Sequence, residues 1–266
     1  MDLELKGKAA IVTGGSRGIG KAVARELARE GVAVAIVARG MEALQATASE
    51  LEGATGGRVL AVCADTGRDE SVKTMVEEAV SQLGRVDILV NCAATPGGTA
   101  PPPKLFEVTQ DDVFSDVNVK VMGYLRCIQA VAPHMVRNGW GRIINISGLA
   151  ARQTGTIVGS MRNVAVVAMT KNVADELGPH GIGAVVVHPS MTYTERGPEL
   201  IARRAAADGI SEEEARKRLY QGNVQGRVIE ARDIAYVVTF LASPKAVAIN
   251  GDVVVAGGGV PRAIYY

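Results

Sequence analysis

The chain has 266 residues, of which 47% are hydrophobic and 21% are charged, an ordinary composition for a globular protein. Its 29 Lys and Arg residues nearly balance its 28 Asp and Glu residues, and the net charge of +1 provides no basic field for nucleic acid or anionic lipid. No run of about eighteen uncharged apolar residues predicts a membrane span, and the opening MDLELKGKAA lacks the apolar run of a signal peptide. We therefore expect a cytoplasmic protein with neither nucleic acid nor a membrane as partner.

Short apolar segments rich in β-branched residues alternate along the chain with longer helical segments. Strands are predicted at 9–13, 32–38, 58–64, 86–91, 141–147, 182–188 and 251–256, and helices at 18–30, 41–52, 69–83, 110–138, 157–178 and 231–242. Strands that are apolar throughout are typical of parallel sheets covered on both faces. The alternation predicts an α/β fold over residues 1–266, a single-domain Rossmann-type doubly wound parallel sheet of about seven strands with helices on both faces.

Two segments interrupt this alternation. TPGGTAPPPK, residues 95–104, is rich in Gly and Pro and predicts a surface loop. Residues 195–222 form a polar, helix-favouring insertion between the sixth and seventh strands. Both follow a strand, and ligands of open α/β sheets bind beyond the carboxyl ends of the strands. The insertion is therefore either a mobile substrate lid or a solvated helical hairpin without a catalytic role.

A glycine-rich turn follows the first strand and opens the first helix. Its spacing is Gly-x-x-x-Gly-x-Gly, and its candidate cofactor residues are Gly14, Ser16, Arg17, Gly18, Ile19 and Gly20. Glycines permit a tight turn, so that backbone N–H groups can approach a pyrophosphate at the positive end of the helix. The three cysteines and three histidines, by contrast, show no metal-ligand spacing, and no metal is expected.

The glycine spacing, Asp65, the stretch Asn91-Cys92-Ala93-Ala94 and Asn118 together resemble the short-chain dehydrogenase/reductase family. The resemblance covers essentially the whole chain, as far as NGDVVVAGGG at 250–259. It implies a small-molecule substrate and a homo-oligomer, a tetramer paired through helices 110–138 and 157–178. It also implies cofactor contacts by a further set of residues, Asp65 against the adenine, with Thr66, Asn91, Ala93, Pro189, Thr192 and Thr194.

The end of the second strand indicates which nicotinamide cofactor is used. A carboxylate there would bind the ribose hydroxyls of NAD and repel a 2′-phosphate, but the position holds Ala38. Arg39 follows it, and Arg17 lies in the glycine turn, so that two guanidinium groups can clamp a phosphate. This pattern predicts NADP(H). The alternative is that both arginines are solvated surface residues.

The resemblance implies a catalytic Ser, Tyr and Lys, with Tyr four residues before Lys, and an Asn one helix earlier. Asn118 fits the Asn, and Ser147 lies near the Ser, although a family member with two serines there would have the catalytic one at the position of Gly148. The Tyr and Lys positions hold Gly159 and Asn163. No Tyr occurs between Tyr124 and Tyr193, and no Lys between Lys120 and Lys171. The candidate catalytic residues are therefore Asn118, Ser147 and Tyr193, the last as a substitute acid. Asn163 can still hydrogen-bond a ribose, and Gly159 is expected to leave a void of about the size of a phenol ring.

These features predict an atypical NADP(H)-dependent oxidoreductase that acts on a carbonyl or secondary alcohol of a small, apolar substrate. Loss of general acid catalysis costs about 10²–10⁴ in rate, which slows an enzyme without abolishing its activity. Two alternatives remain open: a non-redox enzyme of the same fold, such as a lyase, isomerase or cyclase, and a catalytically silent cofactor-binding subunit or sensor.

Overall fold

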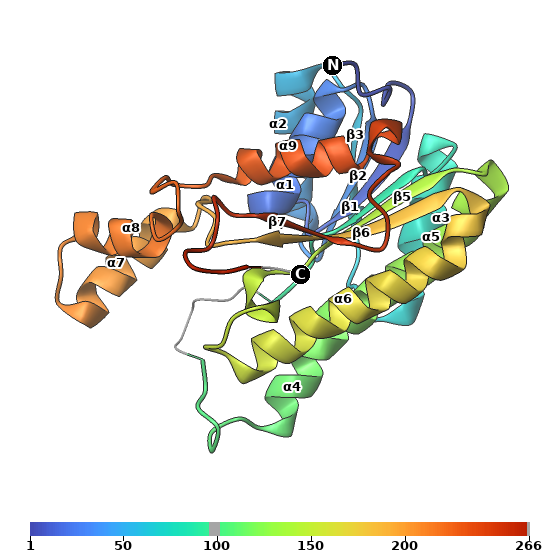
Figure 1. Ribbon diagram of the computed structural model, residues 1–266. Coiled ribbons are helices and arrows are strands. Elements are labelled where there is room, and N and C mark those ends of the chain that lie inside the picture. Colours follow the sequence, from blue (N-terminus) through green and yellow to red (C-terminus); the bar gives the residue numbers. More distant parts are fainter. Residues whose placement is uncertain (96–101, 265–266) are drawn as a thin grey trace.

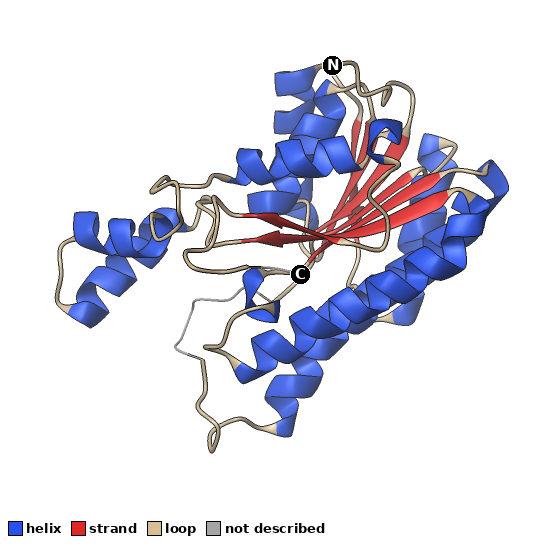
Figure 2. Ribbon diagram, viewed as in Figure 1, coloured by secondary structure: helices blue, strands red, loops and turns tan. Residues whose placement is uncertain are grey.

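A computed structural model describes residues 1–95 and 102–264. Its centre is a seven-stranded parallel sheet with the order β3-β2-β1-β4-β5-β6-β7 (Figures 1 and 2). The strands are β1 (Ala9–Thr13), β2 (Ala33–Ala38), β3 (Val59–Cys63), β4 (Ile88–Asn91), β5 (Gly141–Ile146), β6 (Ile182–Pro189) and β7 (Val253–Ala256). Each matches a predicted strand to within two residues at either end, and the predicted fold class is confirmed.

Helices cover both faces of the sheet. One face packs against α1 (Gly18–Arg29), α2 (Met41–Thr55) and α9 (Ala231–Leu241), and the other against α3 (Asp69–Leu83), α5 (Gly123–Asn138) and α6 (Ile157–Leu177). In β1, Val12 faces the first of these layers and Ile11 the second, and both are fully buried. Burial on both sides explains why the strands read as continuous apolar runs. No helix within the described ranges is long and apolar enough to cross a bilayer.

The strand order reverses between β1 and β4. β1 pairs with β2 on one side and with β4 on the other, so that the connections leaving β1 and β4 diverge at their carboxyl ends. A crevice opens at this point in doubly wound sheets, and ligands bind there. The glycine turn after β1 and the segment after β4 both lie at this reversal.

The predicted helix at 110–138 is divided in the structure. It consists of α4 (Gln110–Val117), a π-helical turn at Asn118–Met122 and α5. A π turn contains one residue more than an α turn, and such turns are frequent at functional sites. Residue types alone do not distinguish a π turn from an α turn, so the sequence predicts one continuous helix. The turn carries Lys120, which is buried.

The insertion at 195–222 contains α7 (Gly197–Asp208) and α8 (Glu212–Tyr220). The two helices pack on a small apolar cluster of their own, and in Figure 1 they project away from the sheet. The remaining elements are short 3₁₀ turns at Leu149–Ala151, Gly178–His180 and Pro244–Ala246. Of the predicted loop at 95–104, residues 96–101 lie outside the described ranges, and residues 102–104 have no regular structure.

Candidate functional site

The glycine turn packs directly against the segment that follows β4. A Cβ added to Gly14, whose φ is +67°, would lie 3.0 Å from the backbone N of Ala93, and one added to Gly20 would lie 2.3 Å from the carbonyl oxygen of Gly14. The hydroxyl of Thr13 accepts hydrogen bonds from the N–H groups of Cys92 and Ala93, at 3.1 and 3.2 Å. Only glycine fits these two positions, and the turn is held with the start of α1 facing the crevice.

A cavity of about 760 Å³ lies over this turn. Many of the predicted cofactor residues line it: Gly14, Ser16, Arg17, Ile19, Gly20, Arg39, Asp65, Thr66, Ala93 and Thr194. Gly18 supplies a backbone N–H at the start of α1. Asn91 is not part of the lining, because its side-chain Nδ2 donates to Oδ1 of Asn145 on the neighbouring strand, at 2.9 Å. Asn91 therefore links β4 to β5 beneath the cavity.

The residues of this cavity fit a nicotinamide dinucleotide that carries a 2′-phosphate. The turn glycines allow close packing against Ala93 and Gly14, and the N–H groups at the start of α1 favour an anion. Arg17 and Arg39 line the same cavity beside Ala38, which has no carboxylate to repel a phosphate. Asp65 lies across the cavity, and its Oδ1 accepts a hydrogen bond from the N–H of Gly67 at 2.9 Å.

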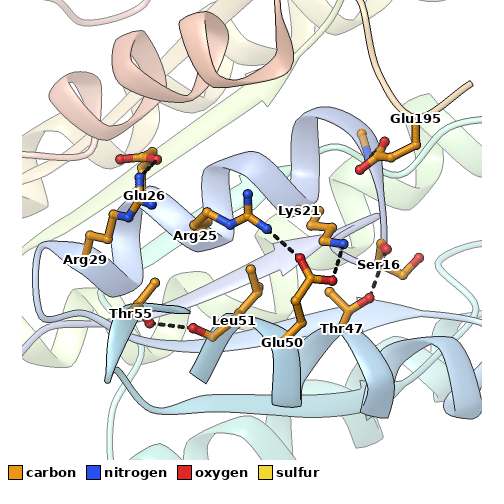
Figure 3. A network of polar contacts seen from close by, with 11 residues as sticks. Ser16, Lys21, Arg25, Glu26, Arg29, Thr47, Glu50, Leu51, Thr55 and Glu195 are labelled. Carbon is orange, nitrogen blue, oxygen red and sulfur yellow. Dashed lines mark hydrogen bonds and ion pairs between the residues drawn. The ribbon is translucent and has the colours of Figure 1, made fainter. Parts of the chain in front are cut away.

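A carboxylate from the other side of the crevice reaches the glycine turn. The N–H of Gly18 donates to Oε2 of Glu195 at 2.9 Å, and Glu195 belongs to the loop between β6 and α7. Figure 3 shows its side chain pointing toward the Ser16 end of α1. On the opposite side of α1, Lys21 and Arg25 both pair with Glu50 of α2, which fixes α2 against the turn (Figure 3). Glu195 thus binds where the helix terminus favours an anion.

A second cavity, of about 1020 Å³, adjoins the first and extends under α7 and α8. Ile19, Arg162 and Thr194 line both cavities. Among the predicted site residues, the second lining includes Ser147, Asn163, Pro189, Thr192 and Thr194. The structure therefore brings together Ser147, Asn163 and the residues after β6, next to the cofactor cavity.

The Gly159 position differs from the expectation of an open void. Thr156 is the N-cap of α6, and its hydroxyl accepts a hydrogen bond from the N–H of Gly159 at 3.1 Å. A Cβ added to Gly159 would lie 2.6 Å from Cγ2 of Thr156. The space beside Gly159 is filled by this side chain, because the cap draws Thr156 over the first turn of the helix.

Asn163 lies in a hydrogen-bonded group with Ser147 and Lys120. The ammonium Nζ of Lys120 donates to Oδ1 of Asn163 and to the carbonyl oxygen of Ser147, both at 3.0 Å. The hydroxyl of Ser147 donates to the carbonyl oxygen of Asn163 at 3.1 Å. Burial, with a smaller effect from Arg162, lowers the pKa of Lys120 to about 7. The sequence interpretation missed Lys120, although a lysine between the apolar residues Val119 and Val121 was a usable signal.

Two of the three candidate catalytic residues point away from these cavities. The side chain of Asn118 donates to the carbonyl oxygen of Gly67 at 3.3 Å, and it lines neither cavity. The ring of Tyr193 packs edge-on against Tyr220 of α8, with centroids 5.3 Å apart. The structure does not bring either side chain together with Ser147.

His188 lies at the end of β6, beneath the second cavity. Its Nδ1 accepts a hydrogen bond from the N–H of Gly148 at 3.2 Å. Burial, together with Arg152 and Lys120, lowers the pKa of His188 to about 4. His188 is therefore neutral at physiological pH and supports the backbone of Gly148.

A family model described as short chain dehydrogenase matches residues 8–205 of the chain. Short-chain reductase protein NovJ of Streptomyces niveus is 35% identical over 95% of this chain and 93% of its own length. The (2S)-[(R)-hydroxy(phenyl)methyl]succinyl-CoA dehydrogenase subunit BbsD of Thauera aromatica is 34% identical, over 96% of this chain and 97% of its own. The chain therefore belongs to the short chain dehydrogenase family, a family of oxidoreductases.

A solved structure agrees with this assignment. L-sorbose reductase from Gluconobacter frateurii, determined in complex with NADPH and L-sorbose, superposes with a TM-score of 0.91. The two chains are 26% identical, and the match covers 99% of this chain and all of the other. The fold of that enzyme is thus shared by nearly all of the described residues of this chain.

Proposed function

We propose that this chain is an NADP(H)-dependent oxidoreductase that interconverts a carbonyl and a secondary alcohol without a tyrosine acid. The observation that carries the proposal is the lining of the cofactor cavity. Arg17 of the glycine turn and Arg39 both line it, and the last residue of β2, Ala38, carries no carboxylate. A 2′-phosphate clamp serves no purpose in folding. The NADPH complex of L-sorbose reductase supports the cofactor assignment.

In this proposal the residues of the chain bind the cofactor, orient the substrate and exclude water. Arg17 and Arg39 hold the 2′-phosphate, and the N–H groups at the start of α1 bind the pyrophosphate. When bound, the cofactor supplies or accepts the hydride. Ser147 borders the second cavity, and because its hydroxyl proton is donated to the Asn163 carbonyl, its oxygen can only accept a hydrogen bond from the hydroxyl of an alcohol substrate. Water supplies the proton, since Tyr193 packs against Tyr220 and would reach the cavity only after the α7–α8 segment rearranges.

The substrate is a small, mostly apolar carbonyl compound or secondary alcohol. Leu149, Ala150, Leu200, Leu219 and Val260 contribute apolar surface to the second cavity. Its charged lining, within the described residues, consists of Arg162, Arg203 and Arg204, with no carboxylate. Residues 195–222 act as the lid, because α7 and α8 supply much of this wall. Each of these arginines is paired with a carboxylate, Arg162 with Asp116, Arg203 with Glu199 and Arg204 with Asp208. The apolar wall therefore decides the match, and a small apolar carbonyl compound fits it best.

Absorbance of NADPH with a panel of ketones and keto acids tests this proposal. Oxidation of NADPH that depends on the keto compound supports it, and apolar ketones are expected to be better substrates than keto acids of the same size. Tight NADPH binding without turnover of any carbonyl or alcohol would reject a redox role.

A catalytically silent subunit is the second candidate. The observation in its favour is the replacement of Tyr and Lys by Gly159 and Asn163, and the relative BbsD is named as a subunit of a dehydrogenase. Such a chain would bind NADP(H) and turn over nothing until it is mixed with an active partner. Activity of the purified chain alone separates the two candidates.

The assembly we propose is a cytoplasmic homotetramer. Exposed apolar side chains occur along α4 and α6, among them Phe114, Met161 and Val164. A second copy can cover this surface, as paired helices do in symmetric oligomers. Light scattering at micromolar concentration distinguishes a tetramer from a monomer.

A further inference from the structure

The most unusual group in the described part of the chain is the ammonium of Lys120. It is carried by the π turn between α4 and α5, and only 4% of the residue is exposed. Buried lysines are rare because transfer of the charge out of water is costly. Here Nζ contacts two oxygen acceptors, the Ser147 carbonyl and Oδ1 of Asn163. Both belong to residues that line the substrate cavity.

The hydrogen bond from Lys120 determines which way the Asn163 amide faces. An ammonium only donates hydrogen bonds, so the atom of Asn163 in contact with it must be the acceptor Oδ1. The NH₂ group then faces the other way. A Cβ added to Gly148 would lie 3.1 Å from Nδ2 of Asn163, and Gly148 lines the substrate cavity. Nδ2 is therefore directed toward the backbone wall of that cavity, where it can donate.

We propose that Lys120 is a positioning residue, which holds Oδ1 of Asn163 so that the Asn163 amide donates to a hydroxyl of the nicotinamide ribose. The charge of the catalytic site thus lies on the π turn, and α6 contributes a neutral donor in place of a lysine. This inference rests on the proposed use of NADP(H). It makes cofactor affinity depend also on Lys120, which belongs neither to the glycine turn nor to the arginine pair.

The surroundings of Lys120 make its hydrogen bond to Asn163 dependent on pH. Several charged or titratable side chains face Lys120 from the neighbouring elements, namely Asp116 of α4, Arg162 of α6, Cys92 after β4 and His188 of β6. Burial raises the pKa of the Cys92 thiol to about 12, so Cys92 is neutral, and His188 is neutral as well. Arg162 forms an ion pair with Asp116. Lys120 therefore changes its charge near neutrality, and its charge-assisted bond to Asn163 weakens as the pH rises through about 7.

Equilibrium binding of NADPH, followed by its fluorescence, tests the proposal with a double-mutant cycle. Lys120→Met and Asn163→Leu are each expected to raise the Kd for NADPH about five- to tenfold. The double variant is expected to match either single variant, because Lys120 acts through Asn163. Lys171→Met serves as the control, since this lysine lies exposed on α6 in a pair with Asp175. Additive losses, or an unchanged Kd in Lys120→Met, overturn the proposal.

A pH series gives a second readout that does not depend on the folding of any Lys120 variant. The ratio of the Kd of Asn163→Leu to that of the wild type is expected to be largest below pH 7 and to shrink above it. The titration of the 2′-phosphate cancels, because both proteins bind the same cofactor. A ratio that stays constant across this range overturns the proposal. Turnover is measured separately, and a protein that shows this coupling without turning over any substrate refutes only the redox function.

Discussion

The crevice has a cofactor half over the glycine turn and a catalytic half around Ser147 and Asn163, and their charged side chains come from different kinds of position in the chain. In the cofactor half, the charged groups come from the positions that the sequence indicates, Arg17 in the glycine turn and Arg39 after β2. In the catalytic half, α6 carries Gly159 and Asn163, and the buried cation Lys120 comes from a π turn one helix earlier. A binding surface made of backbone and surface arginines is determined locally. A buried charge can lie on another element, provided that a neutral side chain such as Asn163 takes over the contact with the cofactor.

The largest expected effect comes from rebuilding the usual catalytic pair. Asn163→Lys alone would place a second ammonium against Lys120, whose Nζ lies 3.0 Å from Oδ1 of Asn163. Gly159→Tyr must also displace Thr156. We therefore expect the double variant to remain slow, and the triple variant with Lys120→Asn to raise kcat/KM for a keto substrate about 10²-fold or more. Equal rates in the double and triple variants would show that the two ammonium groups do not conflict.

A smaller effect is expected in the cofactor half. Arg39→Ala removes one guanidinium group from the 2′-phosphate clamp, and the Kd for NADPH should rise about tenfold to a hundredfold. The Kd for NADH, which lacks that phosphate, should not change. Fluorescence titration with both cofactors measures the pair of constants. If both constants rise equally, Arg39 supports the cavity without recognising the phosphate.

Lys120 also makes stability depend on pH. Its folded-state pKa of about 7 lies below the ordinary value of 10.5, because burial disfavours the charged form. Between these pH values the unfolded chain binds a proton that the folded chain does not, so the free energy of unfolding rises with pH across this window. The gain amounts to a few kcal/mol. Cys92, whose raised pKa has the opposite effect above about pH 9, is common to the wild type and to Lys120→Met. The difference between their free energies of unfolding, measured in urea, should therefore rise with pH across the window.

Most of the fold and of the cofactor half could be predicted from the sequence, because both depend on local patterns. Apolar runs indicated the strands, and the glycine spacing indicated the turn that Gly14 and Gly20 close. The catalytic half depends on contacts between residues far apart in the sequence. The π turn has no residue types of its own that would distinguish it from an α turn, and the bond from Lys120 to Asn163 joins residues 43 positions apart. Tyr193 was predicted as a substitute acid, and that role stays a prediction, since its ring packs on Tyr220.

The smallest effect concerns Glu195, which joins the two halves. Its carboxylate accepts the N–H of Gly18 at the start of α1, the group that we propose for the pyrophosphate. The two anions compete for the same donor and repel each other, so that binding of NADPH must draw Glu195, and with it the loop leading to α7, away from the turn. Glu195→Gln removes the charge but keeps an acceptor, and it should lower the Kd for NADPH about threefold, with the larger gain at low salt. Glu199→Gln is the matched control, because Glu199 lies on α7 and pairs with Arg203 of the same helix. A weaker affinity in Glu195→Gln would mean that Glu195 closes the site over the cofactor and does not compete with it.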